Sequence, residues 1–153
     1  MAPAKKRYRV ARDKYSVEQT SFNGSVAVGQ TTSFVIVPPT TLQGMRKVKH
    51  LTINAVLSSS SSIGCVWALY YLPQGMTAPG LNLTSGQPLV EPNQFVMNTG
   101  VFDGEAGPTR ISSRLSRNLN SGDQIILLVT PVTTSSSGNV PFTGVVRYAV
   151  TLQ

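Results

Sequence analysis

The feature that most constrains the fold is the run at residues 125–129, where five apolar residues follow one another without a break. Such a run is typical of a strand that is buried on both faces inside a packed sheet. Residues 120–123 precede it with the sequence NSGD. Glycine tolerates a positive φ, and Asn, Ser and Asp side chains can hydrogen-bond their own backbone. We therefore predict a tight turn at 120–123 and a core strand after it.

The segment before this turn, residues 110–119, fits two kinds of secondary structure. Ile111, Leu115 and Leu119 recur every four residues with arginines between them, which fits one face of a short helix. Its three serines are poor helix formers, and the neighbouring segments have strand patterns. We favour a strand over a helix for this segment.

Eight segments have strand patterns. In the last, Val146, Tyr148 and Val150 alternate with polar or small residues, which is the period of a half-buried strand. In the third, Val48 is out of phase with the later apolar residues, so we expect a bulge near residue 49. The predicted strands are 17–28, 31–37, 46–57, 64–72, 94–102, 110–119, 123–132 and 142–152. Without a long amphipathic helix, they predict an all-β fold, a single eight-stranded antiparallel jelly-roll sandwich.

Three connections stand out by composition. Residues 58–62 are five serines, and residues 133–139 read TTSSSGN, so both are expected to be exposed loops. Residues 73–93 contain four prolines and three glycines. Connections longer than about 15 residues are uncommon unless they have a function, so this one is a candidate functional loop.

The positive charge of the chain is concentrated at its start. The net charge is +7, and charged residues make up 12% of the 153 residues, about half the usual share. We expect a disordered basic arm at residues 1–15 and one domain at 16–153. The arm would neutralise nucleic-acid phosphates, with Tyr8 available for stacking. Residues 5–7 could in addition serve as the seed of a nuclear import signal, and the alternative is a solvated tail that only aids solubility. The basic arm residues are Lys5, Lys6, Arg7, Arg9, Arg12 and Lys14.

The sequence is poor in catalytic and metal-binding residues. It has one His, one Cys and six carboxylates, so we expect neither an enzyme nor a cofactor or metal. His50 is expected to be structural or exposed, and Cys65 to be a small core residue. Asp103 and Glu105 are only weak evidence for a calcium site. The longest apolar run is eight residues, 65–72, whereas a membrane-spanning helix needs about 20. No membrane partner and no secretory leader are expected.

Five blocks carry a resemblance to a known family. They are the basic head KKRYR, RKVKHLTI at 46–53, WALYYLPQG at 67–75, EPNQFVMNTG at 91–100 and SRLSRNLNSGDQIILLV at 113–129. In this order and spacing, the chain resembles the single jelly-roll capsid proteins of small circular single-stranded DNA viruses. The resemblance implies an eight-stranded sandwich, a closed icosahedral (T=1) shell and a basic arm that faces the packaged genome. The smallest complete icosahedral set would contain about sixty copies.

The expected function is therefore a viral capsid protein that self-assembles and packages a single-stranded genome, with DNA implied by the resemblance. Arg46, Lys47 and Lys49 would extend the nucleic-acid-binding surface of the arm, although an ordinary solvated strand end is an equal alternative. The arginines at 110, 114 and 117 could bind the genome or pair with carboxylates of a neighbouring subunit, and we favour subunit contacts. The expected locations are the virion and, during assembly, the host nucleus. A host receptor is expected, but nothing in the sequence identifies it.

Two other functions fit the same composition. A non-assembling module that binds single-stranded nucleic acid would expose aromatic rings on one sheet face. Trp67, Tyr70 and Tyr71 lie in an apolar run and are expected to be buried instead. A lectin-like sandwich would bind sugars through the connection at 73–93.

Overall fold

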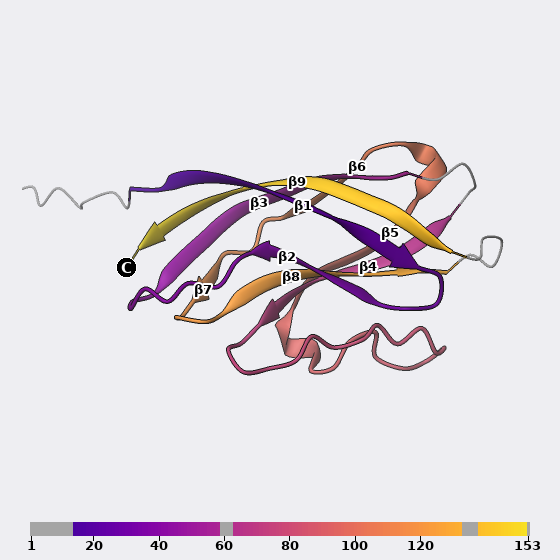
Figure 1. Cartoon of the computed structure of the whole chain (residues 1–153). Coiled ribbons are helices and arrows are strands. Elements are labelled where there is room, and N and C mark those ends of the chain that lie inside the picture. The colour runs from indigo at the N-terminus through magenta and orange to yellow at the C-terminus, as the bar shows by residue number, and fades with distance from the viewer. Residues whose placement is uncertain (1–13, 59–62, 133–137, 153) are drawn as a thin grey trace, which may run out of the picture.

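The protein is an all-β sandwich of two antiparallel sheets (Figure 1). The computed structural model describes residues 14–58, 63–132 and 138–152. The arm residues 1–13 and most of the two serine-rich loops predicted at 58–62 and 133–139 lie outside these ranges. In chain order the described elements are β1 (Ser16–Ala27), β2 (Thr32–Val37), β3 (Arg46–Leu57), β4 (Gly64–Leu72), the 3-10 helix η1 (Asn93–Phe95), β5 (Val96–Asp103), the 3-10 helix η2 (Gly104–Ala106), β6 (Thr109–Ser113), β7 (Arg117–Leu119), β8 (Gln124–Pro131) and β9 (Asn139–Leu152).

The chain crosses repeatedly between the two sheets. The first sheet has the order β1-β9-β3-β6, with β7 also paired to β3, and the second has the order β2-β8-β4-β5. The first and last strands are neighbours, because Ser16 pairs with Val150. The start of β1 and the end of β9 therefore lie at the same end of the sandwich (Figure 1).

The prediction of eight strands is wrong by one, because residues 110–119 form two short strands. Both β6 and β7 pair with β3, so the preference for strand over helix at this segment is confirmed. Ser113 pairs with Leu51 and Arg117 pairs with Val48. Three residues between β6 and β7, 114–116, therefore lie opposite two residues of β3, 49 and 50. The ladder is interrupted because β3 is irregular here.

The irregularity is the bulge expected near residue 49. Lys49 pairs with Ala149 and Thr52 with Arg147, so two residues of β3 lie opposite one residue of β9. His50 sits in this bulge with a φ of 54°, in the left-handed region that non-glycine residues rarely occupy. A bulge redirects the side chains around it, and His50 consequently points out of the sandwich with an exposed side chain.

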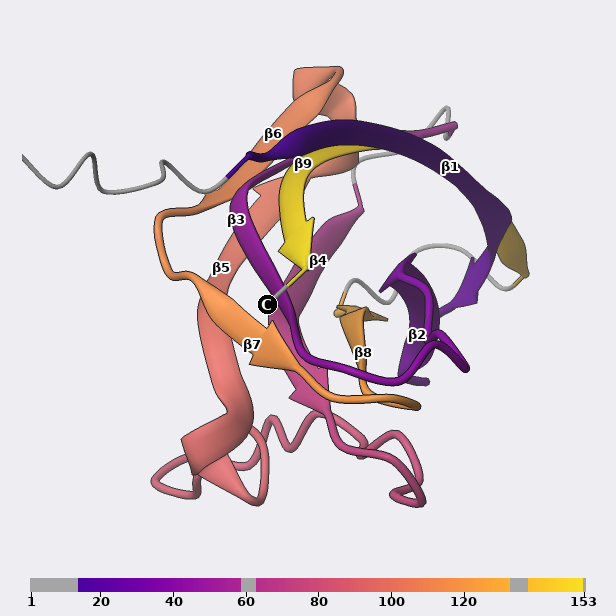
Figure 2. The ribbon, with the colours of Figure 1, turned by 90° about the vertical axis from the view of Figure 1, so that its left-hand side faces the viewer.

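The long connection explains the unbroken apolar run of β8. One side of the run, including Ile125 and Leu127, belongs to the core between the sheets. The other side, Ile126 and Leu128, packs in a second cluster with Val90 from the connection. Both views show the connection on the far side of β4 and β8 from β1 and β9 (Figures 1 and 2). The central strands β4 and β8 are therefore covered on both faces. The outer strands β2 and β5 still expose Val35 and Val101, and the strands of the first sheet bury only alternate residues.

A cluster of phenylalanines fills one part of the core, and it leaves no room for a side chain at Gly144. The ring centroid of Phe22 lies 5.1 Å from that of Phe34 and 5.4 Å from that of Phe142. A Cβ at Gly144 would lie 2.5 Å from Phe22 Cζ and 3.0 Å from the backbone oxygen of Asn54. Neither neighbour can move freely, since the ring is held by the other phenylalanines and the oxygen belongs to β3.

Gly144→Ala is therefore expected to lower the free energy of unfolding by about 1–3 kcal/mol, the usual cost of overpacking a core. Urea denaturation would measure it. Gly80→Ala is the matched control, because its Cβ would meet only Thr31 Oγ1 at 3.8 Å. Equal stability of the two variants would contradict the packing described here.

Candidate nucleic-acid interface

The outward face of the first sheet carries five lysine, arginine or histidine side chains, and we call it the basic sheet face. Alternation along the strands places four of them opposite to the buried residues, and the bulge in β3 turns His50 to the same side, so all five point away from the core. They come from three neighbouring strands, β3, β6 and β9. The residues are Lys47, Lys49, His50, Arg110 and Arg147.

Carboxylates are absent from this face among the described residues. Glu18 is the one acidic residue in the described strands of the first sheet, and it lies on the same side as Phe22 and Val26. Its Oε2 accepts a hydrogen bond of 2.8 Å from the hydroxyl of Tyr148, a core residue. The basic sheet face thus lacks the opposite charges that would neutralise it and is suited to bind a polyanion.

The end of the arm lies against the same face. Lys49 Nζ sits 4.2 Å from the ring centroid of Tyr15, the residue before β1. Tyr15 thereby joins the exposed Lys14 to Lys49 across the start of the sheet. Residues 1–13 directly precede Lys14 and Tyr15, so the arm is attached to the domain at the edge of the basic sheet face.

The structure separates the predicted binding residues into three groups. Lys47 and Lys49 lie on the basic sheet face and Lys14 is exposed beside it. Arg46 shares the inward side of β3 with Val48, and it donates a hydrogen bond of 3.0 Å to the carbonyl of Pro38. The remaining predicted residues, which lie outside the described ranges, are Lys5, Lys6, Arg7, Arg9 and Arg12.

Arg46 belongs to a small group of polar side chains on the inward side of the first sheet, together with Tyr148 and Glu18, and not to the basic sheet face. Burial raises the pKa of Tyr148, and the hydrogen bond to Glu18 raises it further, while the charge of Arg46 acts in the opposite direction. Arg46 Nε is itself buried without a hydrogen-bond partner among the described residues. Its position follows from strand parity, since it lies two residues before the buried Val48.

The arginines expected at subunit contacts have different environments. Arg117 is engaged within its own chain: its guanidinium lies 5.2 Å from the ring centroid of Tyr71 and donates to the carbonyl of Gln94 at 3.2 Å. Arg110 and Arg114 are exposed. Arg110 belongs to the basic sheet face, and Arg114 lies in the break between β6 and β7.

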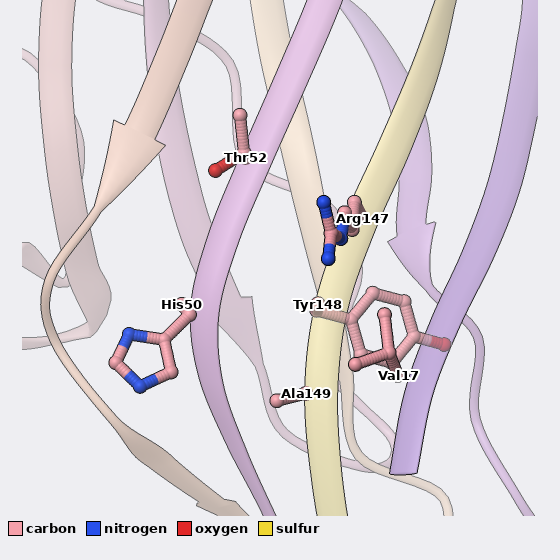
Figure 3. A pocket seen from close by; sticks show the side chains of 6 residues that line it. All are labelled: Val17, His50, Thr52, Arg147, Tyr148 and Ala149. Carbon is pink, nitrogen blue, oxygen red and sulfur yellow. The ribbon is translucent and has the colours of Figure 1, made fainter.

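A hollow of about 330 Å³ lies on the basic sheet face beside the bulge (Figure 3). Arg147 and His50 were not singled out as binding residues from the sequence. The alternation of the last strand places Arg147 outward, but only the pairing of β9 with β3 brings it near the bulge. The residues that line the hollow are Val17, His50, Thr52, Arg147, Tyr148 and Ala149.

A second polar site, centred on Asp123, is structural. Asp123 is 4% exposed and accepts hydrogen bonds from the Tyr71 hydroxyl (2.6 Å), the Gln74 N–H (3.0 Å) and the Asn120 N–H (2.9 Å). Burial alone would raise the pKa of Asp123, but these hydrogen bonds together lower it. Burial, followed by the bond to Asp123 and its charge, raises the pKa of Tyr71 to about 12. The site ties the turn before β8 to the end of β4.

The single cysteine of the chain lies in the core between the sheets. The Cys65 thiol is buried, and burial, followed by the charge of Asp103, raises its pKa to about 11. In the described ranges, no three His, Cys, Asp or Glu side chains gather closely enough to hold a metal ion. No helix in that part of the chain is long and apolar enough to span a membrane. Comparison of the sequence with protein-family models and with curated proteins finds no match.

Proposed function

We propose that this chain is the capsid subunit of a small icosahedral virus with a single-stranded DNA genome. In this proposal the protein is structural and not an enzyme, and it acts in the virion after assembly in the host nucleus. The sandwich would be a jelly roll, with β6 and β7 counted as one interrupted strand beside β3. The sheet orders β1-β9-β3-β6 and β2-β8-β4-β5 support this assignment, since they divide eight strands equally between two sheets.

The observation that carries the proposal is the basic sheet face and its continuity with the arm. A shell that encloses a genome needs positive charge on one side of the subunit and self-complementary contacts elsewhere. Lys49 and Arg147 lie on the outward side of the first sheet, and Tyr15, the last residue of the predicted arm, packs against Lys49 on that side. In a shell, this side would face the interior and the six arm charges would add to it.

The burial of the aromatic residues argues against the non-assembling nucleic-acid-binding module. Trp67 is 7% exposed and Tyr70 is completely buried, so neither offers a ring for base stacking. Tyr71 is partly buried and hydrogen-bonded to Asp123. Among the described residues, Tyr15 is the one aromatic side chain at the basic sheet face. Binding there would rely mainly on charge, as expected for a packaging surface.

The sugar-binding alternative would use the connection between β4 and β5. A hollow of about 530 Å³ is lined there by Pro88, Glu91, Pro92 and Asn93. Most of the apolar residues of this connection instead face the second sheet, where Val90 and Leu89 pack on the cluster around Ile126. Covering that sheet is sufficient to explain the loop.

Electron microscopy of the purified full-length chain tests the proposed function. Uniform closed particles are expected, and nucleic acid extracted from them should be single-stranded and degraded by deoxyribonuclease. Particles should also form without a specific genome sequence, because charge contacts to phosphates carry no sequence information. If only monomers were seen at every salt and protein concentration, the proposed function would be contradicted. If the extracted nucleic acid were degraded only by ribonuclease, the assignment of a DNA genome would be wrong.

A further inference from the structure

We propose that the hollow beside the β-bulge binds one nucleotide of the single-stranded genome, with its phosphate on Arg147 and its base over Ala149. The inference rests on the proposed function and assigns a defined subsite to it. It concerns a binding mode that differs from the general attraction between the arm and phosphates, because the hollow has a shape as well as a charge.

The pairing of three strands builds the hollow. On the outward face, Val17, Ala149 and Lys49 form one row across β1, β9 and β3, and Gln19, Arg147 and Thr52 form the next row. The small side chain of Ala149 forms the floor between Val17 and β3 (Figure 3). Lys49 leaves this space open, since its ammonium group lies over the Tyr15 ring.

The bulge shapes the opposite wall. A regular β3 would place one residue between Lys49 and Thr52 on the inward side, but the extra residue turns His50 outward with its φ of 54°. Figure 3 shows the His50 ring on the side of β3 away from Arg147, so His50 borders the hollow without filling it. The Arg147 guanidinium lies between β3 and β9 in the same view.

Arg147 is chemically available for a phosphate. Its guanidinium has no hydrogen-bond or ion-pair partner among the described residues, and its five donors match the geometry of phosphate oxygens. The Thr52 hydroxyl and His50 offer further polar contacts at the rim. Glu18, the acidic residue of the described strands in this sheet, is turned to Tyr148 on the inward side and cannot compete for the guanidinium.

The remaining lining favours an unpaired base. Val17 is 56% exposed and, with Ala149, presents an apolar surface next to the charged group. A volume of about 330 Å³ is at the small end of ligand sites, which suits one nucleotide unit. In a duplex the bases are stacked and paired, so a base can enter only from a single strand.

The test is a pair of variants in the full-length chain, one that removes charge and one that fills the hollow. Arg147→Gln removes the guanidinium, and Arg110→Gln removes the same charge from the same face outside the hollow. Ala149→Leu fills the floor without changing the charge, and Ser21→Leu adds the same side chain at an exposed position of β1 on the same face. Binding of fluorescent dT10, rU10 and a 10-base-pair DNA duplex would be measured by anisotropy over a salt series.

We expect Arg147→Gln to weaken dT10 binding about tenfold and to reduce the log–log salt slope by about 0.7, the value for one single-strand phosphate contact. Ala149→Leu should weaken binding about fivefold with an unchanged slope, while Ser21→Leu and duplex binding remain at wild-type levels. The rU10 series compares RNA with DNA, and the two oligonucleotides differ in the 2′-hydroxyl and in the 5-methyl group of the base.

Two results would overturn the inference. One is an Ala149→Leu variant that binds dT10 as the wild type does, and the other is equal losses for Arg147→Gln and Arg110→Gln. In either case the wild-type chain could still bind single strands and form shells, so the proposed function would stand without the subsite. Absence of all single-strand binding by the wild type would instead remove the proposed function itself.

Discussion

Asp123→Ala is expected to lower the free energy of unfolding by about 3 kcal/mol or more. The substitution removes the acceptor of three hydrogen bonds and leaves the Tyr71 hydroxyl and the N–H groups of Gln74 and Asn120 without it. A buried donor that loses its partner costs about 1–3 kcal/mol. Chemical denaturation followed by tryptophan fluorescence would measure the loss, because Trp67 lies on the same strand as Tyr71.

Two controls separate the role of Asp123 from a general effect of mutation. Tyr71→Phe removes one donor together with its bond and should cost only about 1 kcal/mol. Acid denaturation gives the second control. Because the folded-state pKa of Asp123 is lowered, its contribution is complete above the unfolded value of about 3.9 and is lost as the pH falls through the folded pKa. Asp123→Ala should lack this component, and an acid transition identical to that of the wild type would contradict the assignment.

Replacement of the six basic arm residues by Gln should remove most of the packaged nucleic acid while particles still form. Each arm charge neutralises about one phosphate, and a single-strand contact contributes about 0.7 to the log–log salt slope. Losing Lys5, Lys6, Arg7, Arg9, Arg12 and Lys14 should therefore reduce the slope by about 4. The ratio of absorbance at 260 and 280 nm in purified particles gives the nucleic-acid content, and a salt titration gives the slope.

Assembly is expected to survive because the first sheet begins at Ser16, after the replaced residues. A variant with Lys at positions 7, 9 and 12 keeps the charge and should package normally. Deletion of residues 2–14 should likewise leave the β fold intact, as circular dichroism would show. Normal nucleic-acid content in the six-Gln variant would mean that the basic sheet face is sufficient for packaging.

The strands were predictable because each has a local signal. The apolar run at 125–129 predicted the core strand β8, and the alternation at the end of the chain predicted the half-buried strand β9. The change of phase after Val48 predicted the bulge in β3. The break between β6 and β7 was not predictable, since it depends on how an irregular partner strand pairs. Asp123 was assigned only to a turn, because nothing local shows that Tyr71, more than fifty residues away, approaches it.

The candidate site was predictable only where it followed strand parity. Lys47 and Lys49 were named from their charge, and alternation alone would have separated them from Arg46, which points inward with Val48. Arg147 required the register between β9 and β3, a relation between segments nearly a hundred residues apart. The role of the connection at 73–93 was likewise hidden, because its fit to Ile126 and Leu128 is a tertiary contact.

The connection between β4 and β5 has a consequence for engineering the protein. Asn82 N–H donates to the carbonyl of Leu89 at 2.8 Å, and Gln87 N–H to that of Thr84 at 3.2 Å, so the tip is closed at its base. Residues 82–88 are exposed, whereas Val90 is anchored against the sheet. A foreign peptide inserted after Ser85 would lengthen this closed tip and leave the anchor in place. The tip is accordingly the position at which the chain should accept a displayed epitope.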